Sequence, residues 1–99
     1  MPTFQKATTI DKIPEGTAKC VSLCEKSIAI FNLEGRFFAI NNICPHRGAS
    51  LASGAIDGRK VICPWHGWEF DIPTGHMWTG EGVESYPVKI EEDQIWIEV

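Results

Sequence analysis

The chain has 99 residues, a length that fits one domain, and a formal net charge of −4. This acidic balance argues against a nucleic-acid-binding protein, which normally presents a basic face. The chain opens with neither a basic segment nor an apolar run, and it has no apolar stretch long enough to span a bilayer. We therefore expect a protein of the cytoplasm that binds neither nucleic acid nor membrane.

The predicted elements are short strands, because apolar residues recur with a period of two and turn signals separate the runs. In chain order, strands are predicted at 18–24, 28–34, 36–42, 60–64, 68–72, 84–90 and 95–99. No window has the periodicity of an amphipathic helix of ordinary length. The sequence therefore predicts an all-β domain of short antiparallel hairpins.

Residues 41–56 break this rhythm, with the sequence NNICPHRGASLASGAI. The segment is rich in Gly, Ala and Ser, and a long irregular segment in a compact domain is usually functional. It contains one Cys-Pro motif, CPHRG, after the strand predicted at 36–42. A second motif, CPWHG, follows the strand predicted at 60–63. Two such loops can converge at one end of an antiparallel sheet.

The two motifs supply four candidate metal ligands. The pattern is Cys44-x-His46, then sixteen residues, then Cys63-x-x-His66. Thiolate and imidazole groups are good ligands for borderline transition metals. Because no secretory signal is visible, metal binding is a more natural use of these cysteines than disulfides.

Three kinds of metal site compete. Two thiolates and two imidazoles can close a tetrahedral zinc site, although each loop carries one ligand of each kind and Cys-x-His is a tight spacing for one ion. A mononuclear iron or copper site lacks the carboxylate of a facial triad or a neighbouring axial Met. A two-iron cluster explains the mixed spacing if each loop sends its cysteine to one iron and its histidine to the other.

The residues resemble the Rieske iron–sulfur family, whose signature is C-x-H, then roughly 15 to 17 residues, then C-x-x-H. The resemblance extends to the proline after each cysteine, to HRG and HG, and to EFDIPTG. It covers most of the chain from about Gly35 onward. It implies one domain over 1–99, an antiparallel β-sandwich of short strands with a cluster-binding subdomain of two loops at about 42–76.

The resemblance implies one 2Fe-2S cluster, with Cys44 and Cys63 on one iron and His46 and His66 on the other. Two ferric ions, two sulfides and two thiolates sum to zero charge, so an added electron meets less repulsion than in a four-thiolate cluster. Rieske potentials lie at about −150 to +300 mV, against about −400 mV for plant-type ferredoxins. The residues expected to shape the loops around the cluster are Pro45, Arg47, Gly48, Pro64, Trp65 and Gly67.

Four positions depart from the high-potential members of the family, whose motifs are C-x-H-x-G-C and C-x-C-H-G-S-x-Y. Ala49 and Trp65 stand where those proteins have disulfide cysteines. Trp68 and Phe70 stand where a Ser and a Tyr donate hydrogen bonds to cluster sulfurs. Because fewer donors leave more electron density on the sulfurs, the sequence predicts a potential near the low end of the range.

These departures favour a ferredoxin that carries single electrons from a flavoprotein or other reductase to a terminal oxygenase, such as a dioxygenase. The chain alone is then an electron-transfer protein and not an enzyme, because it has no room for a catalytic iron domain. Two alternatives stay open. One is a small subunit of an assimilatory nitrite reductase, and the other is a zinc-stabilised interaction module.

The remaining notable side chains are interpreted structurally. Cys20 and Cys24, on one face of a predicted strand, are expected to be buried thiols. Trp68 is expected in the core and His76 on the surface, whereas the sequence leaves open whether Trp65 is apolar cover or partly exposed. Late acidic residues are expected to form a solvated face, and these are Glu81, Glu84, Glu91, Glu92, Asp93 and Glu98.

Overall fold

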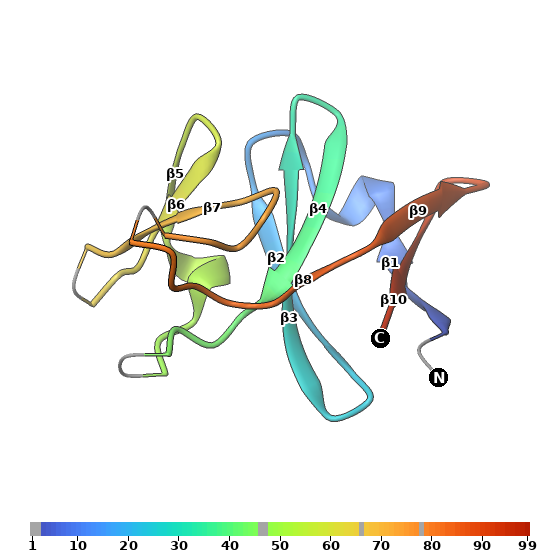
Figure 1. Ribbon diagram of the computed structural model, residues 1–99. Helices are drawn as coiled ribbons and strands as arrows, with labels where there is room; N and C mark the ends of the chain where they lie inside the picture. The colour runs from blue at the N-terminus through green and yellow to red at the C-terminus, as the bar shows by residue number, and fades with distance from the viewer. Residues whose placement is uncertain (1–2, 46–47, 66, 78) are drawn as a thin grey trace.

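The computed structural model describes residues 3–45, 48–65, 67–77 and 79–99. These residues form antiparallel strands joined by turns and by two short 3-10 helices (Figure 1). The strands are β1 (Phe4–Thr9), β2 (Ala18–Leu23), β3 (Lys26–Leu33), β4 (Arg36–Asn41), β5 (Ala55–Asp57), β6 (Lys60–Ile62), β7 (Glu69–Asp71), β8 (Ser85–Tyr86), β9 (Val88–Glu91) and β10 (Gln94–Glu98). The 3-10 helices are η1 (Ile10–Lys12) and η2 (Leu51–Ser53). The prediction of an all-β antiparallel fold is confirmed.

The strands form three small sheets, in the orders β1-β10-β9, β2-β3-β4-β8 and β5-β6-β7. Figure 1 shows the first sheet at the right, the second crossing the middle, and the third at the left beside η2. The first two sheets share one core cluster and form the sandwich. The third sheet packs against β3 and β4 through a second core cluster and carries the second Cys-Pro motif at the end of β6.

The central strand β3 is buried along most of its length, because its sheet is covered on both faces. Side chains alternate between the two faces of a strand. Ile28 and Ile30 accordingly pack with β10 in one core cluster, whereas Ala29 and Phe31 belong to a second cluster with residues of β6 and β7. The sheet of β3 and β4 therefore packs on one face against the β1-β10-β9 sheet. Its other face packs against the end of the molecule that holds both Cys-Pro motifs.

One predicted strand, at 84–90, is in fact two strands in different sheets. β8 pairs with β4, and β9 pairs with β10. Pro87 lies between them and has no N–H to donate to a ladder, so the chain leaves one sheet there and enters the other. Tyr86, just before this proline, is buried, and this burial raises its pKa to about 12.

Two strands, β1 and β5, were not predicted. The sequence of β1, FQKATT, has little apolar alternation, and its pairing with β10 shifts register between Lys6 and Thr8. β5 is only three residues long and lies inside the segment read as irregular. No helix within the described ranges is long and apolar enough to cross a membrane.

Candidate metal centre

The two cysteines of the Cys-Pro motifs lie in the same buried cluster. Cys44 is 0% exposed and Cys63 is 1% exposed. Both belong to the core cluster that includes Leu51, Val61 and Phe70. The structure therefore confirms that two loops distant in sequence converge at one end of the fold.

The first loop is a tight turn that begins at Cys44. The Cys44 N–H donates to the carbonyl oxygen of Ala49 at 2.9 Å, and the Gly48 N–H donates to the carbonyl oxygen of Cys44 at 2.8 Å. Gly48 has a φ of +73°, in the left-handed region that favours glycine.

The second loop repeats this arrangement at the same offsets. The Cys63 N–H donates to the carbonyl oxygen of Trp68 at 2.7 Å, and the Gly67 N–H donates to that of Cys63 at 3.0 Å. Gly67 has a φ of +74°. Each loop therefore turns back on its cysteine through the same two hydrogen bonds and a left-handed glycine, which explains the doubled motif.

The histidines of the two motifs, His46 and His66, lie outside the described residues, as does Arg47. Elsewhere in the chain, among the residues that the structure describes, no group of three or more His, Cys, Asp or Glu side chains is placed to hold a metal ion. The structure therefore brings together the cysteine half of the predicted ligand set.

The rim of the two loops is partly apolar. Trp65 is 63% exposed and Ile43 is 44% exposed, and both Pro45 and Pro64 are exposed. The sequence left open whether Trp65 is buried cover or partly exposed, and the structure places it on the exposed side of the second loop.

Behind the rim the cysteines belong to a cluster of buried apolar side chains. Trp68 packs half-buried against the cluster, and Phe70 and Ala49 are fully enclosed. The prediction that Trp68 belongs to the core holds in part, because its side chain packs against the buried cluster but is itself only half-buried. At these positions the described side chains place aromatic and methyl groups, with no hydroxyl, near the two cysteines.

The prediction for Cys20 and Cys24 is wrong. Both thiols are exposed. Cys20 lies on β2 with its Sγ 3.2 Å from the Ser27 Oγ, whereas Cys24 lies beyond the end of the strand. Cys24 and Glu25 have φ values of +49° and +62° and form the two-residue turn between β2 and β3, a geometry typical of a tight hairpin.

This exposure predicts a clear pattern of alkylation. Iodoacetamide should modify Cys20 and Cys24 rapidly in the folded protein, and Cys44 and Cys63 only after unfolding in the presence of a chelator. Mass spectrometry of the intact chain should count two adducts before unfolding and four after it. Equal modification rates for Cys20 and Cys44 in the folded protein would contradict the burial described here.

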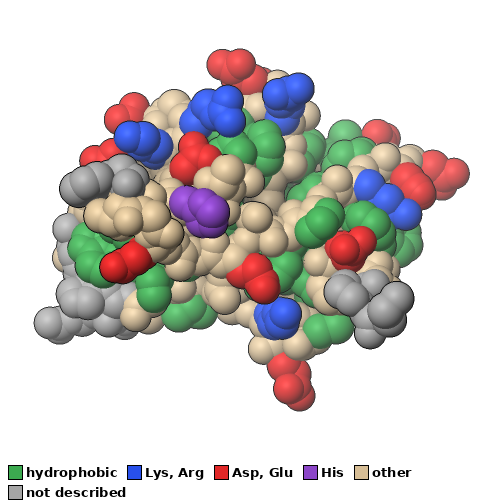
Figure 2. Space-filling model, in the orientation of Figure 1, with side chains coloured by type: hydrophobic (Ala, Val, Ile, Leu, Met, Phe, Trp, Pro, Cys, Tyr) green, Lys and Arg blue, Asp and Glu red, His purple; other side chains and the backbone are tan. Residues whose placement is uncertain are grey.

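Two other surface predictions are confirmed. His76 is exposed, and so are all the late acidic residues except the half-buried Glu98. Glu84 pairs with Lys26 at 3.8 Å, and Glu91 pairs with Lys89 at 3.7 Å. Figure 2 shows acidic and basic side chains interspersed over the visible face.

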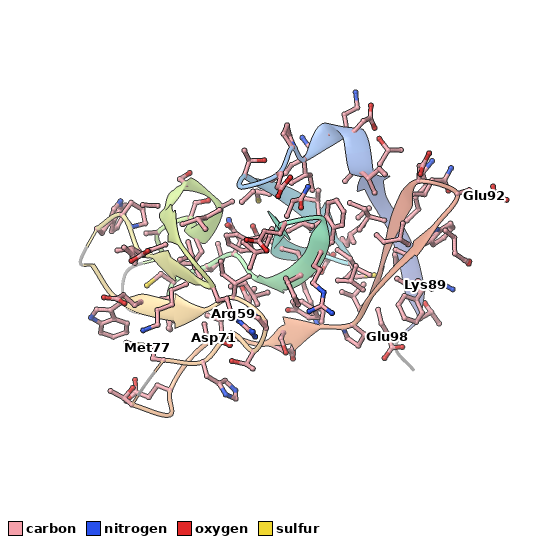
Figure 3. The ribbon with its side chains drawn as sticks, turned by 90° about the horizontal axis from the view of Figure 1, so that it is seen from above. Arg59, Asp71, Met77, Lys89, Glu92 and Glu98 are labelled. Carbon is pink, nitrogen blue, oxygen red and sulfur yellow. The ribbon has the colours of Figure 1, made fainter. Side chains whose placement is uncertain are left out.

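The acidic turn between β9 and β10 lies far from the Cys-Pro loops. Figure 3 places Glu92 at the far tip of that hairpin, well away from the labelled Asp71 on β7. This acidic turn is therefore remote from the candidate centre.

Sequence reasoning missed one residue at the site, Asn42. It is only 3% exposed, lies two residues before Cys44, and joins three segments through hydrogen bonds. The available signal was its position in the irregular segment, since asparagine is rarely buried without a hydrogen-bonding role.

The residues present fit an iron–sulfur group. Two thiols with almost no exposure lie in one apolar cluster, where a thiolate is stable only beside a compensating cation such as a metal. Soft thiolate ligands favour zinc, copper(I) and iron–sulfur clusters over hard cations. The paired glycine turns bring the backbone of both loops close to the two cysteines.

Comparison with known proteins agrees with this chemistry. A family model described as "Rieske [2Fe-2S] domain" matches residues 3–89. The ferredoxin component of the naphthalene 1,2-dioxygenase system of Pseudomonas aeruginosa is 33% identical over 96 residues, which cover 94% of this chain and 92% of that protein.

Solved structures share the fold. A ferredoxin of Sphingomonas yanoikuyae B1 has a TM-score of 0.88 and 29% identity, with 98% of this chain and 99% of that chain covered. A putative NADH-dependent nitrite reductase small subunit from Mycobacterium tuberculosis has a TM-score of 0.90 and 24% identity, with 100% and 96% covered, which shows the fold alone. With the buried cysteine pair and the matched loops, these likenesses establish that the chain belongs to the Rieske [2Fe-2S] domain family, whose cofactor is one 2Fe-2S cluster.

Proposed function

We propose that this protein is a one-electron carrier that passes electrons from a reductase, such as a flavoprotein, to a terminal oxygenase in the cytoplasm. The observation that carries the proposal is the burial of Cys44 and Cys63 in one cluster by two loops of the same backbone shape. A bound 2Fe-2S cluster supplies reversible one-electron transfer. The chain's own residues hold the thiolates, exclude water behind them and leave the rim of the loops open to a partner.

The proposed ligands are Cys44 and Cys63 on one iron and His46 and His66 on the other. The two loops, η2 and the sheet β5-β6-β7 together form the proposed cluster-binding subdomain, at about 42–76, within a single domain of 1–99. Its support is the core cluster that joins this sheet to the cysteines. Gly48 and Gly67 shape the two turns, and the exposed Pro45, Pro64 and Trp65 lie on them. Arg47, outside the described residues, stays a proposed member of the first loop.

The oxygenase as electron acceptor is supported by the relative from Pseudomonas aeruginosa, which is named as the ferredoxin component of a dioxygenase system. The exposed Ile43 and Trp65 lie on the two loops, so the apolar rim is accessible to a docking protein. Desolvation of such apolar side chains is a common source of binding energy between electron-transfer partners.

The proposal is tested by reconstitution. The purified protein should be red-brown, give an electron paramagnetic resonance signal on reduction, and stimulate a reductase–oxygenase pair in proportion to its concentration. A small subunit of a nitrite reductase would instead co-purify with a large sirohaem protein and fail to shuttle. A colourless protein that contains zinc would support the interaction module and overturn the carrier.

The midpoint potential is expected near the low end of the Rieske range of about −150 to +300 mV. Trp68 and Phe70 bring no hydroxyl to the surroundings of the cysteines, and high-potential relatives use hydroxyl donors there to stabilise the reduced cluster. A redox titration followed by visible absorbance measures the potential. A midpoint in the upper half of the range would contradict the argument from these side chains.

A further inference from the structure

The two ligand loops have the same shape, but they are closed in different ways. The second loop is the tip of the hairpin β6–β7, whose ladder pairs Ile62 with Glu69 and Val61 with Phe70. The first loop follows β4 and ends before η2, so no strand returns from it. Its base has one isolated bridge, between Ile43 and Ser50. The first loop therefore needs another source of stability.

Asn42 supplies hydrogen bonds at this base. Its side-chain Oδ1 accepts from the Ser50 hydroxyl at 3.1 Å and from the Ala52 N–H at 2.8 Å. Its backbone carbonyl accepts from the Leu51 N–H at 2.7 Å. These contacts hold the segment that leaves the loop against the residue that enters it.

The same asparagine ties the loop to the central sheet. Its Nδ2 donates to the Ser27 Oγ at 3.2 Å, and its backbone N–H donates to the Ser27 carbonyl oxygen at 2.8 Å. Ser27 lies on β3, the strand whose Ala29 and Phe31 pack in the cluster with Cys44 and Cys63. These hydrogen bonds therefore fix the base of the first loop to β3, the strand that also packs against the cysteines.

We propose that Asn42 is a positioning residue for the first ligand loop. Its hydrogen bonds hold the two ends of that loop together, as the β6–β7 ladder holds the two ends of the second loop. The side chain is 3% exposed, so its removal leaves the Ala52 N–H and the Ser50 hydroxyl, which both belong to half-buried residues, without their acceptor. Asn42 is not one of the proposed ligands. It fixes the turn from which Cys44 projects, and the inference rests on the proposed role of Cys44 as a ligand.

A matched control exists because Asn32 is the other buried polar residue among those the structure describes, at 7% exposure. Its Nδ2 donates to the Ile13 carbonyl oxygen at 2.8 Å, and its Oδ1 accepts from the Gly35 N–H at 2.9 Å. Both contacts lie at the far end of β3 from Ser27. N32A therefore removes a comparable buried amide without touching either ligand loop.

Hydrogen exchange of backbone amides reads the effect directly. In N42A, the amides of Leu51, Ala52 and Cys44 should exchange on the order of tenfold faster than in the wild-type protein. The reason is that the first loop opens more often once the hydrogen bonds of the Asn42 side chain are lost. The amides of Cys63 and Gly67 should keep their wild-type protection, since their loop is closed by its own ladder. S27A, which removes the Nδ2 acceptor together with the Ser27 Oγ contact to the exposed Cys20, should give a smaller change at the same positions.

The loaded protein supplies a second readout. N42A should release iron to a chelator on the order of tenfold faster than wild type, and its reduced-state electron paramagnetic resonance signal should broaden as the ligand geometry becomes heterogeneous. N32A should unfold at lower urea yet keep the wild-type signal and the wild-type rate of iron release under native conditions. This difference separates positioning from general stability.

The inference is overturned if N42A and N32A lose stability alike while exchange, iron release and the resonance signal of N42A match the control. It is also overturned if both ligand loops lose protection equally in N42A. Failure of the carrier proposal would show in the wild-type protein itself, as a missing cluster or missing electron transfer. The two failures are therefore distinguishable.

Discussion

Replacement of Cys63 by serine is expected to abolish binding of the cluster while the fold is kept. Serine preserves the backbone N–H that donates to the Trp68 carbonyl oxygen, and its hydroxyl occupies a smaller volume than the thiol. The hydroxyl is a harder and far more weakly acidic ligand, so it is a poor replacement for a thiolate on iron. Iron per chain should fall to less than about a tenth of the wild-type value, since one missing ligand removes the cluster as a unit.

The control for this loss is C20S, because Cys20 is exposed on β2 and lies outside the buried cluster of Cys44 and Cys63. C20S should retain full iron and the visible absorbance of the wild-type protein. C44S should behave like C63S, since the two cysteines have the same burial and matching loop hydrogen bonds. Retention of the cluster in C63S, or its loss in C20S, would show that the ligands have been misassigned.

The strands that the sequence predicts best are those whose apolar pattern is decided by local alternation. β10 is an example, with Ile95 and Ile97 buried in one cluster as their spacing indicates. β3 is harder, because both of its faces are buried and alternation no longer separates core from solvent. β1 is held in its sheet by long-range pairing with β10, and its own sequence carries little signal of this.

The sequence predicted those site residues that belong to a metal-binding motif. It predicted less well the residues whose burial or contacts depend on tertiary packing. The spacing of Cys44 and Cys63 indicated a shared metal centre, and their burial in one cluster agrees. The exposure of Cys20 was not predictable, since a cysteine on a strand edge and one in a core look alike in sequence. The role of Asn42 depends on Ser27 and Ala52, partners that only the tertiary fold brings close.

The substitution Gly54→Ala is expected to destabilise the fold by about 3 kcal/mol, at the upper end of the usual range for overpacking. A Cβ at position 54 would lie 2.2 Å from the carbonyl oxygen of Ile62 and 3.0 Å from the Val61 Cγ2. Ile62 pairs with β5 on one side and with β7 on the other, so β6 cannot shift away from the added Cβ without disturbing its pairing with both strands. Because Cys63 follows Ile62 directly, the same shift would displace a proposed ligand.

The hairpin of Gly54 also contains the matched control, Gly58→Ala. Gly58 has a φ of +62°, and a Cβ there would meet nothing within 4 Å, so the variant carries only the backbone cost of a left-handed alanine, about 1 kcal/mol. Urea unfolding of both variants measures the difference between a steric and a purely conformational cost. G54A should also lose iron faster than G58A, because its strain lies beside the second ligand loop. Similar unfolding midpoints for the two variants would show that the strands β5 and β6 separate more easily than their pairing indicates.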